Sequence, residues 1–196
     1  MKRTFDLMLS ILTLIFLLPL FAVVGLVIKL ETSGPIFYRQ KRIGKQFKPF
    51  FILKFRTMIQ DADKKGLHIT TGGDVRVTRV GRILRKSKID ELPQIINILK
   101  GEMSFVGPRP EVEKYVSIYK KDYEYILSVK PGITDISSIT FRDEESVLRD
   151  QANPEEYYKM ILLPKKIEFA KAYIKKSSLI FDLVIISKTL KRIIFY

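Results

Sequence analysis

Two adjacent carboxylates, Asp90 and Glu91, lie at the predicted start of a helix. Pro93 follows them, and proline is tolerated inside a helix only in its first turn. The helix dipole there favours the ionised form of Asp90 and attracts anions together with their metal ions. The basic residues that closely precede the pair are Arg82, Arg85, Lys86 and Lys88. An ionised carboxylate among cations can act as a nucleophile or bind Mg²⁺; the alternative is an ordinary acidic helix cap.

Cationic side chains at two other places are suited to bind phosphate. Arg109 stands between two prolines in Gly107–Pro110, which fix the backbone and reduce the entropy lost when the guanidinium binds an anion. Lys54 and Arg56 end a predicted strand, and alternation places them on one face, where they could hold a pyrophosphate. The alternatives are a rigid turn with a solvated Arg and a solvated strand end.

The composition excludes several other chemistries. The 196 residues include no Cys and a single His, His68, which excludes disulfides, thiol catalysis and Cys-ligated zinc and leaves no basis for a multi-His metal site. Neither a P-loop nor a dinucleotide-binding glycine motif occurs. Asp61-Ala62-Asp63 has the D-x-D form of nucleotide-sugar transferases, but two acids on a predicted helix surface are far more often solvated. Carboxylates, hydroxyls and amines remain as nucleophiles.

The positive charge is concentrated next to an apolar segment. The formal net charge is +14. Lys29–Lys100 holds 17 Lys and Arg against 6 Asp and Glu, a surplus of 11. Such a surface attracts nucleic acid, phosphorylated metabolites or acidic lipid headgroups. Acidic lipid is the simplest partner beside a membrane segment, at about 1 kcal/mol per basic residue near the surface.

The N-terminal run Leu7–Ile28 contains 18 apolar residues among 22, and as a helix it would extend roughly 33 Å. That length matches the hydrocarbon core of a bilayer. Both flanks are basic, whereas a spanning helix would place only one of them on the cytoplasmic side. Pro19 lies near the middle and can bend the helix sharply, so that both flanks return to one face. The freed carbonyls near Ile15 and Phe16 would then need donors, for which Ser10, Thr13 or the folded domain are candidates. These features leave a spanning helix and a re-entrant helix open.

The residues after this run predict one mostly helical α+β domain over 31–196, with residues 1–30 as the membrane segment. A turn signal precedes two β-like runs, which predict a small hairpin. The last helix suits either the membrane interface or the core. The predicted strands are 36–39 and 50–54, the predicted helices are 57–64, 77–86, 90–99, 111–129, 154–175 and 178–195, and the predicted loops are 65–75 and 101–110.

Together these motifs resemble the bacterial sugar transferases, the monotopic polyprenol-phosphate phosphoglycosyl transferases of glycan assembly. The resemblance covers essentially the whole chain, at the size of the minimal members. The stretches that carry it are Gly34–Gly44 (GPIFYRQKRIG), Lys54–Met58 (KFRTM), Asp74–Pro110 (DVRVTRVGRILRKSKIDELPQIINILKGEMSFVGPRP) and, more loosely, Lys130–Thr134 (KPGIT) and Ser178–Thr189 (SLIFDLVIISKT). DELPQ and GPRP in this spacing, behind a basic R-x-G-R-x-x-R, are highly specific.

The resemblance implies transfer of a sugar 1-phosphate from a UDP-sugar to a polyprenol phosphate, with release of UMP. It implies that Asp90 is the nucleophile and a Mg²⁺ ligand, and that Glu91 is its partner or general base. Substrate-binding roles follow for the cationic residues and, in a supporting role, for the aspartate of the S-L-x-x-D pattern. These residues are Lys54, Arg56, Arg85, Arg109 and Asp182.

The resemblance also implies a location and partners. The family's N-terminal helix is re-entrant and broken at a proline, here Pro19, although Leu18 stands where the family commonly has Ser. The expected place is the cytoplasmic face of a bacterial inner membrane with anionic lipids, near downstream glycosyltransferases and without nucleic acid. The alternatives are a non-catalytic membrane-anchored basic module that binds anionic lipid or nucleic acid, and a direct glycosyltransferase that releases UDP.

Overall fold

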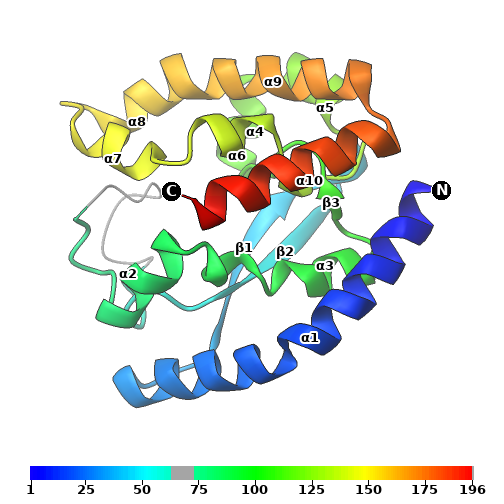
Figure 1. The fold of residues 1–196 in the computed structure, drawn as a ribbon. Coiled ribbons are helices and arrows are strands. Elements are labelled where there is room, and N and C mark those ends of the chain that lie inside the picture. Colours follow the sequence, from blue (N-terminus) through cyan, green and yellow to red (C-terminus); the bar gives the residue numbers. More distant parts are fainter. Residues whose placement is uncertain (63–72, 196) are drawn as a thin grey trace.

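The protein folds into a mostly helical α+β unit, seen in a computed structural model that describes residues 1–62 and 73–195. Figure 1 shows α1 along one side and α9 along the opposite side, with the β-hairpin and α10 between them. The elements are α1 (Lys2–Glu31), β1 (Phe37–Ile43), β2 (Pro49–Phe55), α2 (Arg79–Lys86), α3 (Gln94–Lys100), β3 (Ser104–Val106), α4 (Glu113–Ile118), α5 (Lys120–Ile126), β4 (Gly132–Thr134), α6 (Ile136–Thr140), α7 (Glu144–Arg149), α8 (Pro154–Tyr157), α9 (Leu163–Lys176) and α10 (Leu179–Ile194).

The predicted hairpin is confirmed, with longer strands than expected. β1 and β2 pair antiparallel, from Phe37 opposite Phe55 to Ile43 opposite Pro49. The connecting turn has positive φ at Gln46 (57°). β2 packs its buried side chains against α3 and the residues that follow it, so that the hairpin carries Lys54 towards the start of α3.

A parallel pair, β3 with β4, was not predicted, because residues 101–110 were expected to be a loop. Ser104 pairs with Gly132, and Val106 with Thr134. The strands continue into a very close backbone approach, since a Cβ on Gly132 would lie 2.1 Å from the nitrogen of Gly107. Glycine is therefore required there, and the approach fixes the backbone that leads to the two prolines of the GPRP segment.

Helix α1 is held to the rest of the fold at its N-terminal end by polar contacts. Lys2 forms an ion pair with Asp182 of α10 and donates to the Tyr173 hydroxyl at 3.1 Å. Arg3 donates to the last carbonyls of α3 at 2.5 and 3.0 Å, where the helix dipole favours a cation. The buried Asp6 carboxylate accepts from a hydroxyl and a backbone N–H of β3 at 3.1 and 3.3 Å.

The C-terminal end of α1 is held mainly by apolar packing. Val24 and Ile28 are buried in a cluster with Phe55 of β2 and Leu84 of α2. The Glu31 carboxylate accepts from a backbone N–H of α2 at 3.1 Å. Both ends of α1 therefore pack on the same folded unit, and Figure 1 shows the helix changing direction between them.

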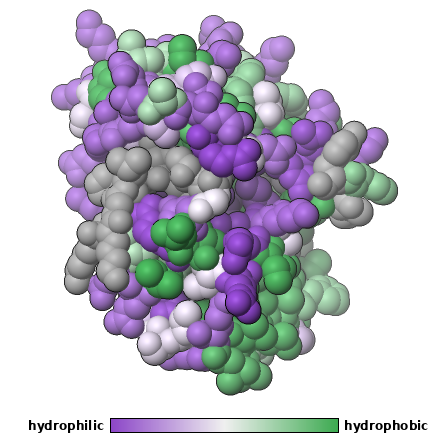
Figure 2. Space-filling model, turned by 90° about the vertical axis from the view of Figure 1, so that its left-hand side faces the viewer, coloured by the Kyte–Doolittle hydropathy of each residue, from purple (hydrophilic) through white to green (hydrophobic). Residues whose placement is uncertain are grey.

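The middle of α1 exposes apolar side chains. Within the described residues it is the single helix long and apolar enough to cross a membrane. Hydrogen-bonded helix continues through Pro19, so the predicted break is a bend within one helix. Ser10 and Thr13 donate to the carbonyls of Asp6 and Leu9, and not to the freed carbonyls for which they were candidate donors. Figure 2 shows hydrophobic side chains gathered at the bottom of the molecule, where Figure 1 places α1.

Other predicted elements differ in detail from the structure. The helix predicted for 57–64 is wrong in its described part, because Met58 instead forms a bridge with Val77; residues 63–72, with Asp63, His68 and most of the loop predicted for 65–75, lie outside the described ones. The helix predicted for 111–129 divides at Tyr119 into α4 and α5. Helices α6 and α7 were not predicted.

The largest apolar core lies among α4, α5, α7, α9 and the π-helical turn before α9. Tyr115, Tyr123 and Leu163 are buried there with their neighbours. A π-helical turn, Tyr158–Leu162, joins α8 to α9, whose second residue is Pro164. This core supports one side of the cleft described below.

Candidate active site

The predicted acidic pair lies at a helix start, as the proline implied. Lys88 adopts a left-handed conformation with φ 59° and begins a 3₁₀ turn, Ile89–Glu91. Pro93 then precedes α3. Helix α3 is fastened to β2 by Asn97, whose side chain accepts from the Leu53 N–H at 3.0 Å and donates to a β2 carbonyl at 2.8 Å. The dyad therefore lies directly before a helix whose position is set by the hairpin.

Glu91 connects two of the predicted cationic residues. Its Oε1 accepts from the Lys54 ammonium at 2.6 Å and from the Arg109 guanidinium at 2.5 Å, and its Oε2 accepts from Arg109 at 3.3 Å. Burial alone would raise the pKa of Glu91, but the charges of Arg109 and Lys54 hold it well below its usual range. The same pairing raises the pKa of Arg109 above its usual value, so both partners stay ionised.

Asp90 differs from its neighbour in having no such partner. Its side chain is 7% exposed, and Oδ1 is buried without a hydrogen bond to any described residue. Burial raises the pKa of Asp90 to about 6, against the opposing charge of Lys54. A buried acceptor without a donor is costly and calls for an explanation, which a reacting carboxylate or a metal ligand provides.

The remaining predicted residues have different surroundings. Arg85 donates to the Thr57 hydroxyl at 2.9 Å and pairs with Glu145 at 2.9 Å. Arg56 is buried and donates to the carbonyls of Ser33 and Thr32 at 2.5 and 2.8 Å, which fixes the exit from α1.

Asp182 is not among the residues that the structure brings together around the dyad. It is buried beside Lys2 and Tyr173, and it accepts from the Tyr173 hydroxyl at 2.7 Å. It therefore ties α1 to α9 and α10, and these contacts account for its burial without any substrate.

A cleft of about 710 Å³ runs beside Glu91. Asp90 is its direct neighbour in the chain but is not among the residues that line the cleft. Its size lies within the range of ligand pockets. Lys54, Arg56, Arg85, Glu91 and Arg109 line it, so five of the seven predicted site residues share one concave surface. Figure 2 shows a largely hydrophilic face above the apolar side chains of α1.

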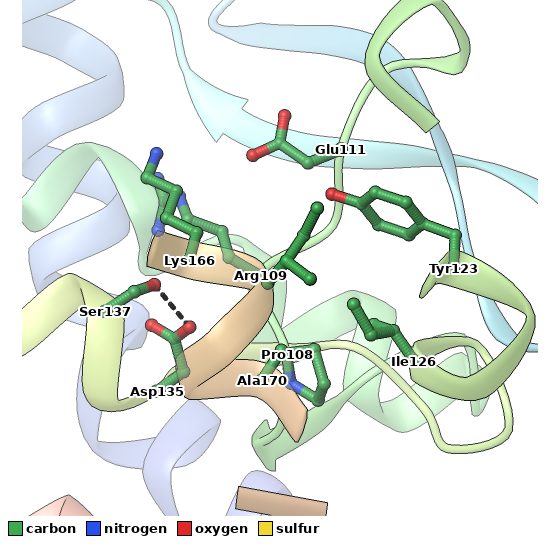
Figure 3. A pocket seen from close by; sticks show the side chains of 10 residues that line it. Pro108, Arg109, Glu111, Tyr123, Ile126, Asp135, Ser137, Lys166 and Ala170 are labelled. Carbon is green, nitrogen blue, oxygen red and sulfur yellow. Dashed lines mark hydrogen bonds between the residues drawn. The ribbon is translucent and has the colours of Figure 1, made fainter. Parts of the chain in front are cut away.

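Arg109 also borders a small cavity of about 10 Å³, which is room for about one water molecule. Figure 3 shows its lining, with the carboxylate of Asp135 and the hydroxyl of Ser137 facing one another; these atoms are 2.5 Å apart. Asp135 and Glu144 add to the negative surroundings that keep Arg109 charged. The positive charge of Arg109 is thus favoured by Asp135 and Glu144 as well as by Glu91.

The sequence did not indicate several other cleft residues. Glu111, Tyr115, Tyr158 and Lys166 are all buried and all line the cleft. They lie on three separate stretches of chain, so no local spacing joins them. One signal was present for Glu111, which directly follows the GPRP segment.

The full chain, residues 1–196, matches the family described as bacterial sugar transferase. The protein belongs to this family. It is 37% identical to the UDP-N-acetylgalactosamine-undecaprenyl-phosphate N-acetylgalactosaminephosphotransferase of Aeromonas hydrophila over 98% of this chain and 43% of that protein. It is also 37% identical to the exopolysaccharide production protein ExoY of Sinorhizobium fredii, over 96% of this chain and 83% of that protein.

A third relative is the UDP-glucose:undecaprenyl-phosphate glucose-1-phosphate transferase of Escherichia coli. It is 37% identical over 96% of this chain but only 39% of its own length. The chain therefore spans less than half of the length of two of these three relatives, and most of the third. Two of these relatives are named for sugar-phosphate transfer to undecaprenyl phosphate, and one is named for exopolysaccharide production.

Proposed function

We propose that this sugar transferase moves a sugar 1-phosphate from a UDP-sugar to a polyprenol phosphate such as undecaprenyl phosphate, and releases UMP. This would be the first membrane step in the assembly of a glycan. The observation that carries the proposal is the buried, unpartnered carboxylate of Asp90 beside a cationic cleft. The names of the relatives support the donor and acceptor classes, and the geometry supplies the groups that such a reaction requires.

The proposed reaction has two displacements at the same phosphorus. A carboxylate oxygen of Asp90 attacks the β-phosphorus of the UDP-sugar, a new P–O bond forms, and the bond to UMP breaks. A phosphate oxygen of the polyprenol phosphate then attacks the aspartyl phosphosugar, which forms the diphosphate product and frees Asp90. Covalent catalysis of this kind divides one difficult step into two easier ones.

The fixed cations would neutralise the diphosphate during both steps. Lys54 and Arg109 are held by Glu91, so their charges are placed before substrate arrives, which favours electrostatic stabilisation. The low pKa of Glu91 makes it a weak base. We therefore assign Glu91 the role of positioning these two cations in preference to that of a general base. Arg85 borders the same cleft and would add a further positive charge.

Mg²⁺ is the cofactor that fits these residues. Among the described residues no three Asp, Glu or His side chains gather at one place, so a cage made only of protein ligands is not available. Mg²⁺ commonly uses one or two carboxylates and completes its shell with substrate phosphates and waters. Asp90, with its unpartnered oxygen, would hold the ion, which would supply charge neutralisation for the leaving phosphate. Chelation with EDTA should stop turnover, and added Mg²⁺ should restore it.

We also propose that α1 is a re-entrant helix over residues 1–30, at the cytoplasmic face of the bacterial inner membrane. Its two ends contact the same folded unit, and the apolar middle is exposed. The apolar side chains of α10 would lie at the interface, near anionic lipids and downstream glycosyltransferases. A chain without Cys permits single Cys residues at positions 2 and 31. A membrane-impermeant thiol reagent should label neither position in intact cells and both after permeabilisation; labelling of position 2 from outside would show a spanning helix.

The released nucleotide tests the proposed reaction against its alternatives. With a UDP-sugar and undecaprenyl phosphate, the transferase should release UMP, and with donor alone one phosphosugar should be found on Asp90 by peptide mass spectrometry. Release of UDP would identify a direct glycosyltransferase. No nucleotide release from any UDP-sugar would leave the anionic-lipid module as the better interpretation.

A further inference from the structure

Part of the cleft wall carries buried polar groups that the phosphate chemistry does not use. Glu111 and Lys166 are only 5% and 8% exposed. The Tyr158 hydroxyl donates to Glu111 at 2.6 Å, and Lys166 pairs with Glu144 at 2.6 Å. Burying charged groups is unfavourable unless they are paired and hydrogen-bonded. This wall is therefore a connected polar surface, supported by the core of α4 and α9.

One member of the wall has no partner. Tyr115 is 4% exposed and lines the cleft, yet its hydroxyl is buried without a hydrogen bond to any described residue. Its ring packs against that of Tyr158, with centroids 4.8 Å apart. Burial raises the pKa of Tyr115 above its usual range, so the hydroxyl remains a donor at physiological pH. Buried polar groups without partners are rare in native proteins, and a ligand atom would satisfy this one.

The chemistry of the wall matches hydroxyl groups better than phosphate. Glu111 accepts from Tyr158 and, at 3.4 Å, from Arg42, which leaves acceptor capacity on its carboxylate because an ionised carboxylate has about four acceptor sites. Glu144 lines the same cleft. Both carboxylates are paired with cations, Glu111 with Arg42 and Glu144 with Lys166, so these groups offer the diphosphate no surplus positive charge, whereas their oxygens can accept hydrogen bonds from neutral hydroxyls.

The wall is also connected to the phosphate-binding groups. Glu111 lies two residues after Arg109 in the chain, and both side chains border the same cleft. A ligand whose phosphate is held by Arg109 could therefore extend towards Glu111 and Tyr115.

We propose that this wall is the subsite for the sugar ring of the nucleotide sugar, with Tyr115 donating a hydrogen bond to a ring substituent and Glu111 accepting one from a hydroxyl. The assignment rests on the proposed function for the identity of the donor. Tyr115 would then discriminate between sugars, and the nucleotide would bind in another part of the cleft.

The test compares Tyr115→Phe with Tyr125→Phe, a matched loss of one hydroxyl at an exposed position of α5. The full chain is assayed with undecaprenyl phosphate and, in turn, UDP-glucose, UDP-galactose and their N-acetylamino counterparts. Loss of a neutral hydrogen bond should reduce kcat/KM for the preferred sugar about three- to tenfold. The other sugars should lose less, and inhibition by UMP should not change. Tyr125→Phe should match the wild type throughout.

A second variant and a binding measurement keep the subsite assignment separable from the proposed reaction. Glu111→Gln should also reduce the ratio of kcat/KM between the preferred sugar and the others. The rise in melting temperature that each UDP-sugar causes, compared with that caused by UMP, should rank the sugars in the same order as kcat/KM. A wild type that binds UDP-sugars without releasing UMP contradicts the proposed reaction, and the sugar-dependent shifts then still test the subsite. Equal losses for all sugars, weaker UMP inhibition in Tyr115→Phe, or unchanged ratios in both variants would overturn the subsite.

Discussion

Replacing Asp90 by Asn should abolish turnover and, at the same time, stabilise the fold. Asp90 is buried, and burial raises its pKa from 3.8 to about 6. A raised pKa in the folded state means that folding favours the protonated carboxyl, so the ionised form opposes folding once the pH rises through about 4 to 6. The carboxylate needed for nucleophilic attack is therefore maintained at the expense of stability, a trade-off that active sites commonly show.

The size of the effect follows from the same values. At about 1.4 kcal/mol for each pH unit, a pKa raised from 3.8 to about 6 corresponds to about 3 kcal/mol at neutral pH. Asn carries no charge at any pH and should remove this unfavourable contribution. For a chain of this length, about 3 kcal/mol corresponds to a melting temperature higher by roughly 6–12 °C.

The assay is thermal unfolding followed by far-ultraviolet circular dichroism, because the chain has no Trp to report by fluorescence. Wild type and Asp90→Asn are compared in the same detergent with EDTA, so that no Mg²⁺ compensates the charge of Asp90. The comparison is made at about pH 8 and at about pH 4, where the difference should largely vanish. Asp74→Asn is the control of opposite sign, since a hydrogen bond from Arg76 lowers the pKa of Asp74 and its loss should destabilise. If Asp90→Asn melts at or below the wild-type temperature near pH 8, burial of an uncompensated charge is not the correct account of this site.

The remaining predictions concern the ion pairs of Glu91 with Lys54 and Arg109, which we call the charge clamp, the ion pair between Lys2 and Asp182, and the pH dependence of activity. Arg109→Lys should reduce kcat/KM at least tenfold, about 1.4 kcal/mol, because an ammonium cannot reproduce the two hydrogen bonds to Glu91; wild-type kinetics would argue against the clamp. Asp182→Asn should lower the free energy of unfolding by about 1–3 kcal/mol through its contacts with Lys2, and an unchanged melting temperature would contradict this. The kcat/KM value should decline as the pH falls through about 6, where Asp90 becomes protonated; a flat profile would contradict an ionised nucleophile.

The sequence was sufficient for features that depend on local spacing. The apolar run gave α1, the paired β-like runs gave the hairpin, and Pro93 placed Asp90 and Glu91 at a helix start. In each case neighbouring residues determine the outcome, through hydrophobic periodicity or the fixed geometry of proline.

Features that depend on distant residues were not predictable in the same way. The strand Ser104–Val106 forms because Gly132 lets two backbones approach, a contact made across a long stretch of chain. The clamp on Glu91 requires Lys54 and Arg109 to meet, and no spacing encodes that meeting. The same reason applies to Asp182, whose motif was visible but whose partner at the other end of the chain was not.

The ion pair between Lys2 and Asp182 has a consequence for how the protein is made. These residues are 180 positions apart, so at ribosomal speeds of about 5–20 residues per second the first turn of α1 waits roughly 10–40 s for its partner. During that interval α1 has been synthesised but lacks its ion pair with α10. In the topology proposed above, the orientation of α1 during this interval would depend on the positive charges of Lys2 and Arg3 and on the bend of this helix, which contains Pro19. The ion pair with α10, which forms last, would then stabilise a topology that α1 had adopted during synthesis.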